Sequence, residues 1–332
     1  MQPFFLFRLL IVVLSVYCAG SVEAAQVENL KLAGYEGAQL QRGLHNHLVL
    51  HAKVNGQVAS FIVDTGAGLS LLQTNRAKSL GISSGSSKSL AFVKGKAHQT
   101  ATIEDLRAGD MRLGKVRVAL FEARQMRGGA STADGVIGVD LLRRHRAVIN
   151  CRSKQIFFKT DPLRRVNLVE TTRAMGFVRV PIQETAGGYL MVPCNIRGKA
   201  GRLLLDTGAF VTILDKEATS QFFSLKGRPS GMTARGFDRR SVPLTMAEID
   251  DLRIGTVRTA AQSVLLMDIL GREGRRPPSR MNSGMGSLQA SVRVELPKAP
   301  FLGLLGNELL DQHWAIIDLD SMSLFLRPGA LR

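Results

Sequence analysis

Cysteine is scarce in this sequence, with three residues in a chain of 332. The first of them, Cys18, lies in an apolar N-terminal segment, which leaves Cys151 and Cys194 in the rest of the chain. These two residues can form at most one disulfide bond, so the chain is not a disulfide-stapled scaffold. Their positions in the sequence leave open whether they pair.

The motifs of several enzyme classes are also missing. No glycine-rich phosphate loop, nucleophilic serine or cysteine motif or zinc signature occurs in the chain. His45, His47 and His51 alternate along one face of an expected strand, and three histidines can bind a metal ion. They have no acidic or cysteine partner at a suitable spacing, so we favour a partly exposed strand face and expect neither a metal nor another cofactor.

Acidic residues are outnumbered, because 27 Asp and Glu stand against 44 Lys and Arg and give a formal net charge of +17. No long basic block and no basic motif interleaved with aromatic residues accompanies this charge. We therefore expect no nucleic-acid partner. In an exported protein, such a charge favours association with anionic surfaces of the cell envelope.

Only the N-terminus carries a long apolar run. Residues 1–24 combine a single Arg8, an apolar stretch that extends through Val16 and the sequence Val-Glu-Ala before Ala25. This arrangement is typical of a cleaved signal peptide and predicts a periplasmic or secreted protein. The alternative is an uncleaved membrane anchor, but the run is short for a membrane span.

The remainder of the chain repeats itself. The sequence FIVDTGAGLSLL at 61–72 is restated as LLLDTGAFVTIL at 203–214, and further matching blocks follow both copies in the same order. Five matched blocks indicate two homologous units, the second with a loop-like insertion rich in Gly, Pro, Ser and Arg. The expected segments are residues 25–159, a linker at 160–179 and residues 180–332, with the insertion around residues 271–298.

Short segments rich in Val, Ile, Leu and Phe and bounded by Gly or Asn predict strands throughout both units. The sequences VNGQ at 54–57 and IRGK at 196–199 predict hairpin turns. The best helical candidates are short, and they follow the two Asp-Thr-Gly motifs or lie at GVDLLRRH and GNELLDQH. Strands and helices do not alternate, so the pattern favours an all-β fold of two mostly antiparallel barrels.

Two hydrophobic residues followed by Asp-Thr-Gly-Ala, with a later hydrophobic-hydrophobic-Gly sequence ending at Gly138 or Gly306, resemble one lobe of an aspartic protease. The Asp-Thr-Gly-Ala form is the retroviral, or retropepsin-like, variant, and two such lobes in one chain resemble the bilobal pepsin-like arrangement. The resemblance implies two closed β-barrel lobes related by a pseudo-twofold axis, with the active site in the cleft between them. Gly138 and Gly306 would let the downstream strand pass close to the catalytic loop.

A pseudo-twofold relation would bring Asp64 and Asp206 together as the catalytic pair. Two adjacent carboxylates cannot both ionise cheaply, so they share one proton. The ionised member can activate a water and the protonated member can donate to a peptide carbonyl, which predicts an aspartic endopeptidase acting on polypeptides. The alternative for each motif is a plain strand-to-turn exit, but two copies inside a repeat favour the catalytic pair.

The neighbours of the two aspartates have expected roles as well. Gly66 and Gly208 allow a tight turn and let backbone N–H groups approach the carboxylates. By the family resemblance, the hydroxyls of Thr65 and Thr207 reach across to the opposite loop and hold the pair together.

Ala67 and Ala209 depart from the pepsin-like pattern, in which a Ser or Thr hydroxyl supports the ionised carboxylate. Loss of that hydrogen bond raises the pKa values of the pair. We therefore expect activity at weakly acidic to neutral pH.

Each unit has room for a hairpin flap between its Asp-Thr-Gly motif and the next shared block. Candidate substrate-binding tips are Gly95 in FVKGKAH and Gly236 in TARGFDR. Ordinary surface hairpins are the alternative. The spacing favours two flaps, and no tyrosine lies near either tip, so the flap tyrosine of the family is absent.

We expect a monomer, because one chain already holds both aspartates. Two other interpretations stay open. One is a non-catalytic exported protein that binds extended peptides in the same interlobe cleft, and the other is a catalytic homodimer of tandem units.

Overall fold

The computed structural model describes most of the chain. The described residues are 27, 30–43, 46–83, 90–93, 96–122, 133–223, 225, 227–235, 241–260, 262–269 and 299–329. Strands predominate among them, and none of their helices is long and apolar enough to cross a membrane. The expected signal peptide and the expected insertion lie outside these residues.

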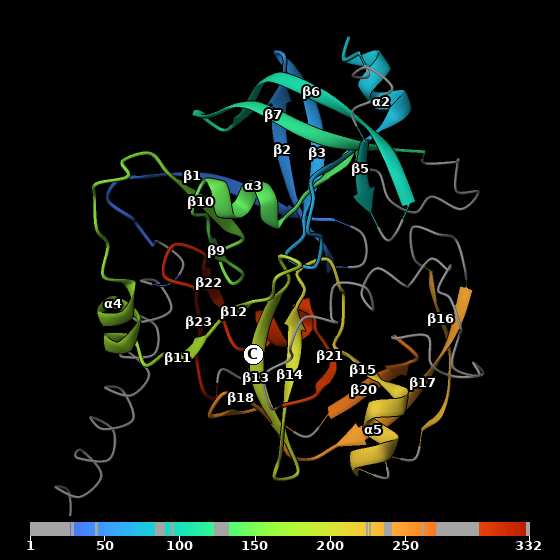
Figure 1. Ribbon diagram of the computed structural model, residues 1–332. Coiled ribbons are helices and arrows are strands. Elements are labelled where there is room, and N and C mark those ends of the chain that lie inside the picture. Colours follow the sequence, from blue (N-terminus) through green and yellow to red (C-terminus); the bar gives the residue numbers. More distant parts are fainter. Residues whose placement is uncertain are drawn as a thin grey trace, which may run out of the picture.

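The first lobe is a closed barrel, drawn in blue to green in Figure 1. Around the barrel the strands are β2 (Leu48–Val54), β3 (Gln57–Val63), β8 (Gly135–Ile137), β4 (Leu71–Gln73), β7 (Met111–Phe121) and β6 (Lys96–Ala108). The barrel closes because β6 also pairs with β2, from Ala52 opposite Ala108 to Val54 opposite Leu106. The lobe is completed by β5 (Leu90–Val93), α2 (Thr74–Ser79) and α3 (Val139–Arg144).

The second lobe repeats this strand order with one difference. Its sheet runs β16 (Arg228–Arg235), β17 (Ser241–Ile249), β20 (Gln262–Met267), β15 (Ile213–Asp215), β21 (Phe301–Leu305), β14 (Lys199–Leu205), β13 (Leu190–Ile196), β18 (Leu252–Ile254) and β19 (Val257–Arg258), with β12 (Gln183–Glu184) beside β13 and helices α5 (Lys216–Phe223) and α7 (Asn307–Gln312). In the first lobe β6 closes the barrel by pairing with β2, and the strand of the second lobe equivalent to β6 is β17. Here β13 pairs instead with β18, which follows a bend at Asp250 and Asp251, so this sheet stays open among the described residues. The two-lobed all-β fold is confirmed, with one closed barrel and one open sheet.

A six-stranded sheet joins the lobes on the left of Figure 1. Its strands are β1 (Tyr35–Arg42), β10 (Gln155–Lys159), β9 (Val148–Asn150), β22 (Ile316–Asp318), β23 (Ser323–Leu326) and β11 (Val178–Pro181). The join is the antiparallel pair β9 and β22, in which Val148 lies opposite Asp318 and Asn150 opposite Ile316. Backbone hydrogen bonds therefore run without a break from one lobe to the other.

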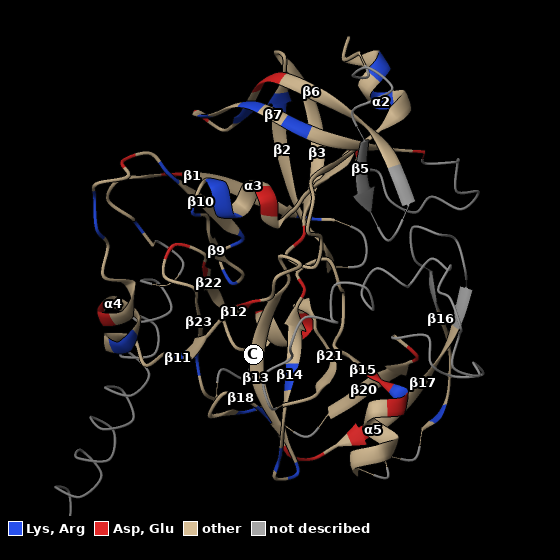
Figure 2. Cartoon of the chain, viewed as in Figure 1, with Lys and Arg blue, Asp and Glu red and all other residues tan. Residues whose placement is uncertain are grey.

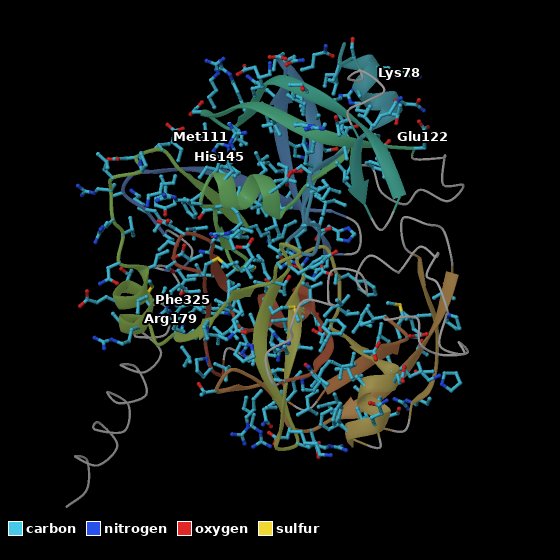
Figure 3. The ribbon with its side chains drawn as sticks, in the orientation of Figure 1. Lys78, Met111, Glu122, His145, Arg179 and Phe325 are labelled. Carbon is cyan, nitrogen blue, oxygen red and sulfur yellow. The ribbon has the colours of Figure 1, made fainter. Side chains whose placement is uncertain are left out.

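The segment expected as a linker carries helix α4 (Leu168–Ala174) before the chain enters β11. Asn167 caps the start of the helix, because its side chain accepts a hydrogen bond from the Glu170 amide at 3.2 Å. In the adjoining sheet, Arg179 of β11 lies opposite Phe325 of β23, as Figure 3 shows.

Both predicted hairpin turns are confirmed. The φ angles are 48° at Asn55 and 86° at Gly56 between β2 and β3, and 48° at Arg197 and 83° at Gly198 between β13 and β14. Two consecutive positive φ values suit the turn whose twist matches that of the flanking strands. The predicted short helices are also present, as α2 and α5 after the Asp-Thr-Gly loops and as α3 and α7.

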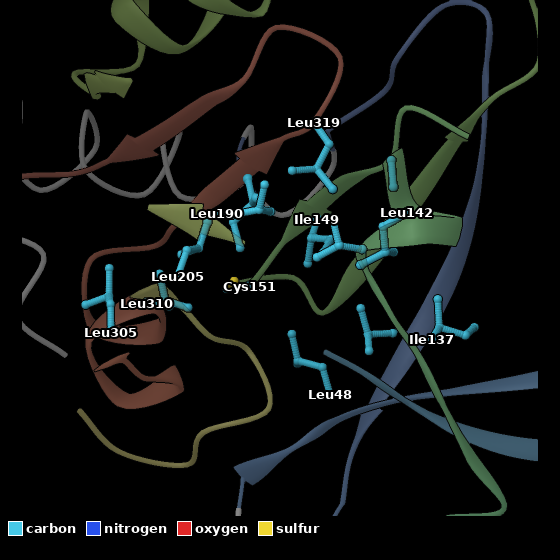
Figure 4. Close-up of a cluster of buried hydrophobic side chains, with 14 of the residues drawn as sticks. Leu48, Ile137, Leu142, Ile149, Cys151, Leu190, Leu205, Leu305, Leu310 and Leu319 are labelled. Carbon is cyan, nitrogen blue, oxygen red and sulfur yellow. The ribbon is translucent and has the colours of Figure 1, made fainter. Parts of the chain in front are cut away.

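The hydrophobic core is continuous across the two lobes. In Figure 4, Leu48, Ile137 and Ile149 of the first lobe share one buried cluster with Leu190 and Leu205 of the second. A contiguous core of this kind resists relative movement of the lobes, because any rotation would open packed apolar contacts.

Cys151 and Cys194 are both buried and both free, so no disulfide joins them. Burial raises the pKa of each thiol to about 12. The excess positive charge is not gathered on one lobe: in Figure 2, Lys and Arg appear on β7 and α3 of the first lobe and on β14 of the second.

Candidate active site

Each Asp-Thr-Gly-Ala loop begins where a strand with a buried C-terminal end stops. Strand β3 pairs in parallel with β8, and β14 pairs in parallel with β21. The amide of Asp64 donates to the Ile137 carbonyl at 3.0 Å, and the amide of Asp206 donates to the Leu305 carbonyl at 3.0 Å. These bonds extend each parallel ladder by one residue, so the two aspartates leave their sheets at equivalent positions.

Backbone amides hold the Asp64 carboxylate. Its Oδ1 accepts from the Gly66 amide at 2.8 Å and from the Ala67 amide at 3.1 Å. Two donors from a tight loop compensate part of the cost of placing a carboxylate against an apolar strand.

The Asp206 carboxylate is held in the same way. Its Oδ1 accepts from the Gly208 amide at 2.9 Å and from the Ala209 amide at 3.0 Å. The two loops thus reproduce each other within 0.1 Å in both distances.

Each carboxylate lies against the glycine of the opposite loop. A Cβ atom placed on Gly66 would lie 2.5 Å from Cγ of Asp206, and one placed on Gly208 would lie 2.4 Å from Cγ of Asp64. Such distances exclude any side chain at these two positions. Each carboxyl group also alters the pKa of the other, so Asp64 and Asp206 titrate as one unit.

The two threonines lock the loops to each other. Thr65 Oγ1 donates to the Leu205 carbonyl at 2.8 Å and accepts from the Thr207 amide at 3.0 Å. Thr207 Oγ1 donates to the Val63 carbonyl at 2.7 Å and accepts from the Thr65 amide at 3.0 Å. Both side chains are fully buried, so these four interlobe hydrogen bonds are shielded from solvent.

The glycines downstream of the loops permit a close crossing. A Cβ atom on Gly138 would lie 2.7 Å from the Ala67 carbonyl oxygen, and one on Gly306 would lie 2.3 Å from the carbonyl carbon of Val211. The backbone after each glycine passes directly against the Asp-Thr-Gly-Ala loop. It also bonds to that loop, because the amide of Val139 donates to the Ala67 carbonyl at 2.8 Å.

Burial raises the pKa of both aspartates, although each side chain keeps partial exposure to solvent. For Asp64, hydrogen bonds from Gly66 and Asp206 and the charge of His47 act in the opposite direction on the pKa. For Asp206, the neighbouring charge of Asp64 adds to burial, so the pKa lies well above its usual value. The pair therefore retains a proton at a pH where an isolated aspartate would be ionised.

Two polar residues that the sequence interpretation did not place at the site contact its loops. His47 Nε2 lies 2.9 Å from the Gly208 carbonyl oxygen. Asn307 Nδ2 donates to the Thr207 carbonyl at 2.6 Å and to the Asn46 carbonyl at 3.2 Å. A signal was present in the repeat, because Asn307 replaces the apolar Val139 of the first unit.

Hairpins lie where flaps were expected in both lobes. Strands β5 and β6 pair with Val93 opposite Lys96, and strands β16 and β17 pair with Arg235 opposite Ser241. The candidate tips Gly95 and Gly236 lie between these strands and outside the described residues.

The histidine-rich segment does not assemble a metal centre in the described part of the chain, where no group of three or more His, Cys, Asp or Glu side chains is suited to bind a metal ion. His47 turns toward the second lobe, whereas the exposed His51 lies 3.1 Å from Gln41 Oε1. His45 is outside the described residues.

Comparison with known proteins agrees with this geometry. The sequence profile described as "aspartyl protease" matches the chain twice, at residues 50–141 and 192–308. Each match contains one Asp-Thr-Gly-Ala motif, and together the matches cover well over half of the chain. No curated protein matches the sequence. The chain therefore belongs to the aspartyl protease family.

Proposed function

We propose that the protein is an aspartic endopeptidase that hydrolyses peptide bonds with a water activated between Asp64 and Asp206. The observation that carries the proposal is the packing of these two carboxyl groups, each of which lies directly against the glycine of the opposite loop. An arrangement that only ended two strands would not require the carboxyl groups to meet.

The proposed reaction uses one proton shared by the pair. The ionised carboxylate takes a proton from the water while the water oxygen attacks the carbonyl carbon of the peptide. The protonated carboxyl group donates its proton to the carbonyl oxygen, which gives a tetrahedral diol. Collapse of the diol breaks the C–N bond: the carboxyl group that took its proton from the water gives it to the leaving amine nitrogen, and the other carboxylate takes a proton from a diol hydroxyl, which restores the shared proton of the pair.

The substrate class follows from the elements around the pair. An extended polypeptide can lie between the lobes and bond through its backbone to the hairpins β5–β6 and β16–β17. A single chain suffices in this proposal, because four threonine hydrogen bonds already join the two halves of the site. Gel filtration tests this point, and a dimer as the smallest active species would contradict it.

Variants of the two aspartates test the activity. Asp64→Asn and Asp206→Asn each remove the ability to exchange a proton while keeping size and shape. We expect both to lose cleavage of a mixed peptide library by at least about 10³-fold, measured by mass spectrometry of the products. The matched control is Asp110→Asn, which makes the same change at an exposed turn and should cleave as the parent does.

Two outcomes would contradict the proposal. If every peptide that the parent cleaves is also cleaved by the two variants, or if the parent cleaves none, the protein is not an aspartic endopeptidase. If the parent nevertheless retains extended peptides with an affinity equal to that of the variants, the non-catalytic peptide-binding alternative replaces it.

We also propose that the protein is exported and loses residues 1–24. Its support is the apolar leader in the sequence together with Val27, which is fully buried and whose carbonyl accepts from Asn150 Nδ2 at 2.7 Å. Cleavage after Ala24 would leave this anchored residue in the mature protein. N-terminal sequencing of the protein recovered from the cell envelope or medium should begin at Ala25, and a retained Met1 would contradict the proposal.

A further inference from the structure

A short segment of the first lobe reaches across to the aspartate loop of the second lobe. His47 Nε2 lies 2.9 Å from the carbonyl oxygen of Gly208, and the carbonyl of the preceding Asn46 accepts from Asn307 Nδ2 at 3.2 Å. A carbonyl oxygen only accepts hydrogen bonds, so His47 Nε2 carries a hydrogen and donates. The bond survives a change of charge, because the neutral Nε2–H tautomer and the imidazolium ion can both donate it.

The residue that His47 holds contacts both carboxyl groups. The Gly208 amide donates to Asp206 Oδ1 at 2.9 Å, and the Cα of Gly208 faces Asp64 so closely that a Cβ there would lie 2.4 Å from the Asp64 Cγ. The imidazole is therefore one residue removed from both members of the pair.

The other half of the site has a different residue at this place. The repeat aligns Leu48 with Leu190, so the counterpart of His47 is Tyr189. The backbone of Tyr189 bonds within its own hairpin, with its carbonyl accepting from the Thr185 amide at 2.9 Å and its amide donating to Thr185 Oγ1 at 3.1 Å. An imidazole that can become positively charged thus stands on one side of a pair that is otherwise symmetric.

We propose that His47 is a positioning residue that makes the two aspartates unequal: it fixes the Gly208 peptide and favours an ionised Asp64 beside a protonated Asp206. The kinetic consequences of this inference rest on the proposed peptidase function, whereas its electrostatic part can be measured without turnover.

The charges around the pair support this direction. The charge of His47 lowers the pKa of Asp64 against the effect of burial, whereas burial and the charge of Asp64 raise the pKa of Asp206. In this proposal the proton shared by the pair resides mainly on Asp206. General-base attack on water falls to Asp64 and donation to the peptide carbonyl falls to Asp206.

The other charged groups near the His47 segment form closed contacts of their own. Arg42 and Asp311 pair at 2.6 Å, and the same guanidinium bonds to the side chain of Asn46. Glu308, the residue after Asn307 on α7, accepts from the Thr212 amide at 2.6 Å. The Arg42–Asp311 pair carries no net charge, and burial raises the pKa of Glu308 and so favours its neutral form, which leaves His47 as the group among these that can alter the balance between the two aspartates.

An NMR titration of the histidine rings tests the electrostatic part. If Asp64 is the ionised member, Asp64→Asn moves the single negative charge of the pair to Asp206, whose pKa falls once the charge of Asp64 is gone, and so removes the carboxylate that His47 acts on and lowers the pKa of its imidazole by up to about one unit. Asp206→Asn replaces a group that is already neutral and should lower that pKa by much less. His51, exposed on strand β2 just after the His47 segment, is the internal control and should titrate equally in all three proteins. Equal shifts in the two variants, or the larger shift in Asp206→Asn, would overturn the assignment.

Kinetics of His47 variants test the positioning part. We expect His47→Ala to reduce kcat by about 10²-fold with little change in KM, because a displaced Gly208 loop misplaces Asp206. His47→Gln can still donate to the Gly208 carbonyl and should recover most of kcat. It lacks the positive charge, so the acidic limb of its kcat/KM profile should move up by about one pH unit. His51→Gln is the matched control and should match the parent.

The two arms separate the inference from the function on which it builds. A parent that cleaves peptides while His47→Ala and His47→Gln behave like the parent contradicts the inference alone. A parent without cleavage in which the His47 titration still follows Asp64→Asn contradicts the proposed function and leaves the unequal pair standing.

Discussion

In the first lobe Ser70 supports the backbone next to the Asp-Thr-Gly-Ala loop, and in the second lobe Thr212 takes the equivalent place. Ser70 Oγ accepts from the Gly138 amide at 3.0 Å, and Thr212 Oγ1 accepts from the Gly306 amide at 3.1 Å. The contacts nearest the aspartates are therefore matched in kind and in length. Symmetry is retained where two carboxyl groups must meet face to face.

One step further from the aspartates, the two lobes diverge. Ser70 Oγ donates to Asp140 at 2.7 Å, whereas in the second lobe Glu308 accepts from the Thr212 amide at 2.6 Å in addition to bonding the Thr212 side chain. Burial raises the pKa of Glu308. The difference teaches that the chemistry constrains the inner contacts strongly, whereas a supporting carboxylate can reach its loop by more than one route.

The largest expected effect comes from breaking the matched inner contacts. Gly66→Ala and Gly208→Ala each place a Cβ about where the opposite carboxyl group lies, at 2.5 Å and 2.4 Å from its carbon. We expect both to abolish cleavage, by at least about 10³-fold, and by similar factors in the two lobes. Gly68→Ala is the control, since its Cβ would meet only a carbonyl oxygen at 3.8 Å. Near-normal activity of Gly66→Ala would show that the pair is not assembled as described.

The interlobe threonines come next. Thr65→Val keeps the shape of the side chain but leaves the Thr207 amide and the Leu205 carbonyl without partners. Buried unpaired groups cost about 1–3 kcal/mol each, so the free energy of unfolding should fall by about 2–5 kcal/mol in urea denaturation. Thr207→Val should lose a similar amount, and Thr65→Ser should restore most of it. Unequal losses in the free energy of unfolding would show that the threonine of one lobe contributes more to the interlobe contact than the threonine of the other.

A smaller effect is expected where the lobes differ. Asn307→Val installs the residue of the first lobe and removes the donor to the Thr207 and Asn46 carbonyls. We expect the free energy of unfolding to fall by about 1–3 kcal/mol. The reciprocal change Val139→Asn buries an amide in an apolar place and should also destabilise. If both variants keep the Tm of the parent in thermal denaturation, this difference between the lobes contributes nothing to stability.

Neutralising one aspartate should stabilise the protein, and the sign follows from the raised pKa. A carboxyl group whose pKa is higher in the folded state stabilises the fold fully below the unfolded pKa of about 3.9. That stability is lost as the pH rises through the folded pKa. Asp206→Asn should therefore raise Tm at pH 7, by about 2–4 °C for each kcal/mol recovered, and leave Tm unchanged near pH 3. A lower Tm at pH 7 would contradict the raised pKa.

The smallest effect concerns the alanines. With no hydroxyl at Ala67 or Ala209, the rate should peak at weakly acidic to neutral pH, and an optimum below about pH 3 would refute this. Ala67→Ser adds one donor near Asp64 and should move the acidic limb of the rate profile down by about half a unit. An upward shift would show that the new hydroxyl does not reach the carboxylate.

Much of the fold could be predicted from the sequence repeat. The I′ turns at Asn55 and Arg197 follow from Asn-Gly and Arg-Gly between apolar runs, and the short helices follow from local patterns. Whether each barrel closes could not be predicted from the sequence. It depends on whether β6 or β18 reaches the first strand of its lobe, and that choice turns on a bend at Asp250 with no distinctive sequence.

The sequence by itself determined the two Asp-Thr-Gly-Ala loops, because a carboxylate at the end of an apolar strand needs the amides of a tight glycine turn wherever the chain goes next. Only the tertiary structure decided that Gly66 packs on Asp206 and that His47 holds Gly208, since those contacts join positions 140 and 161 residues apart. Local hydrogen bonding acts within a few residues and can be read from a motif, whereas the meeting of two lobes depends on the whole packed core.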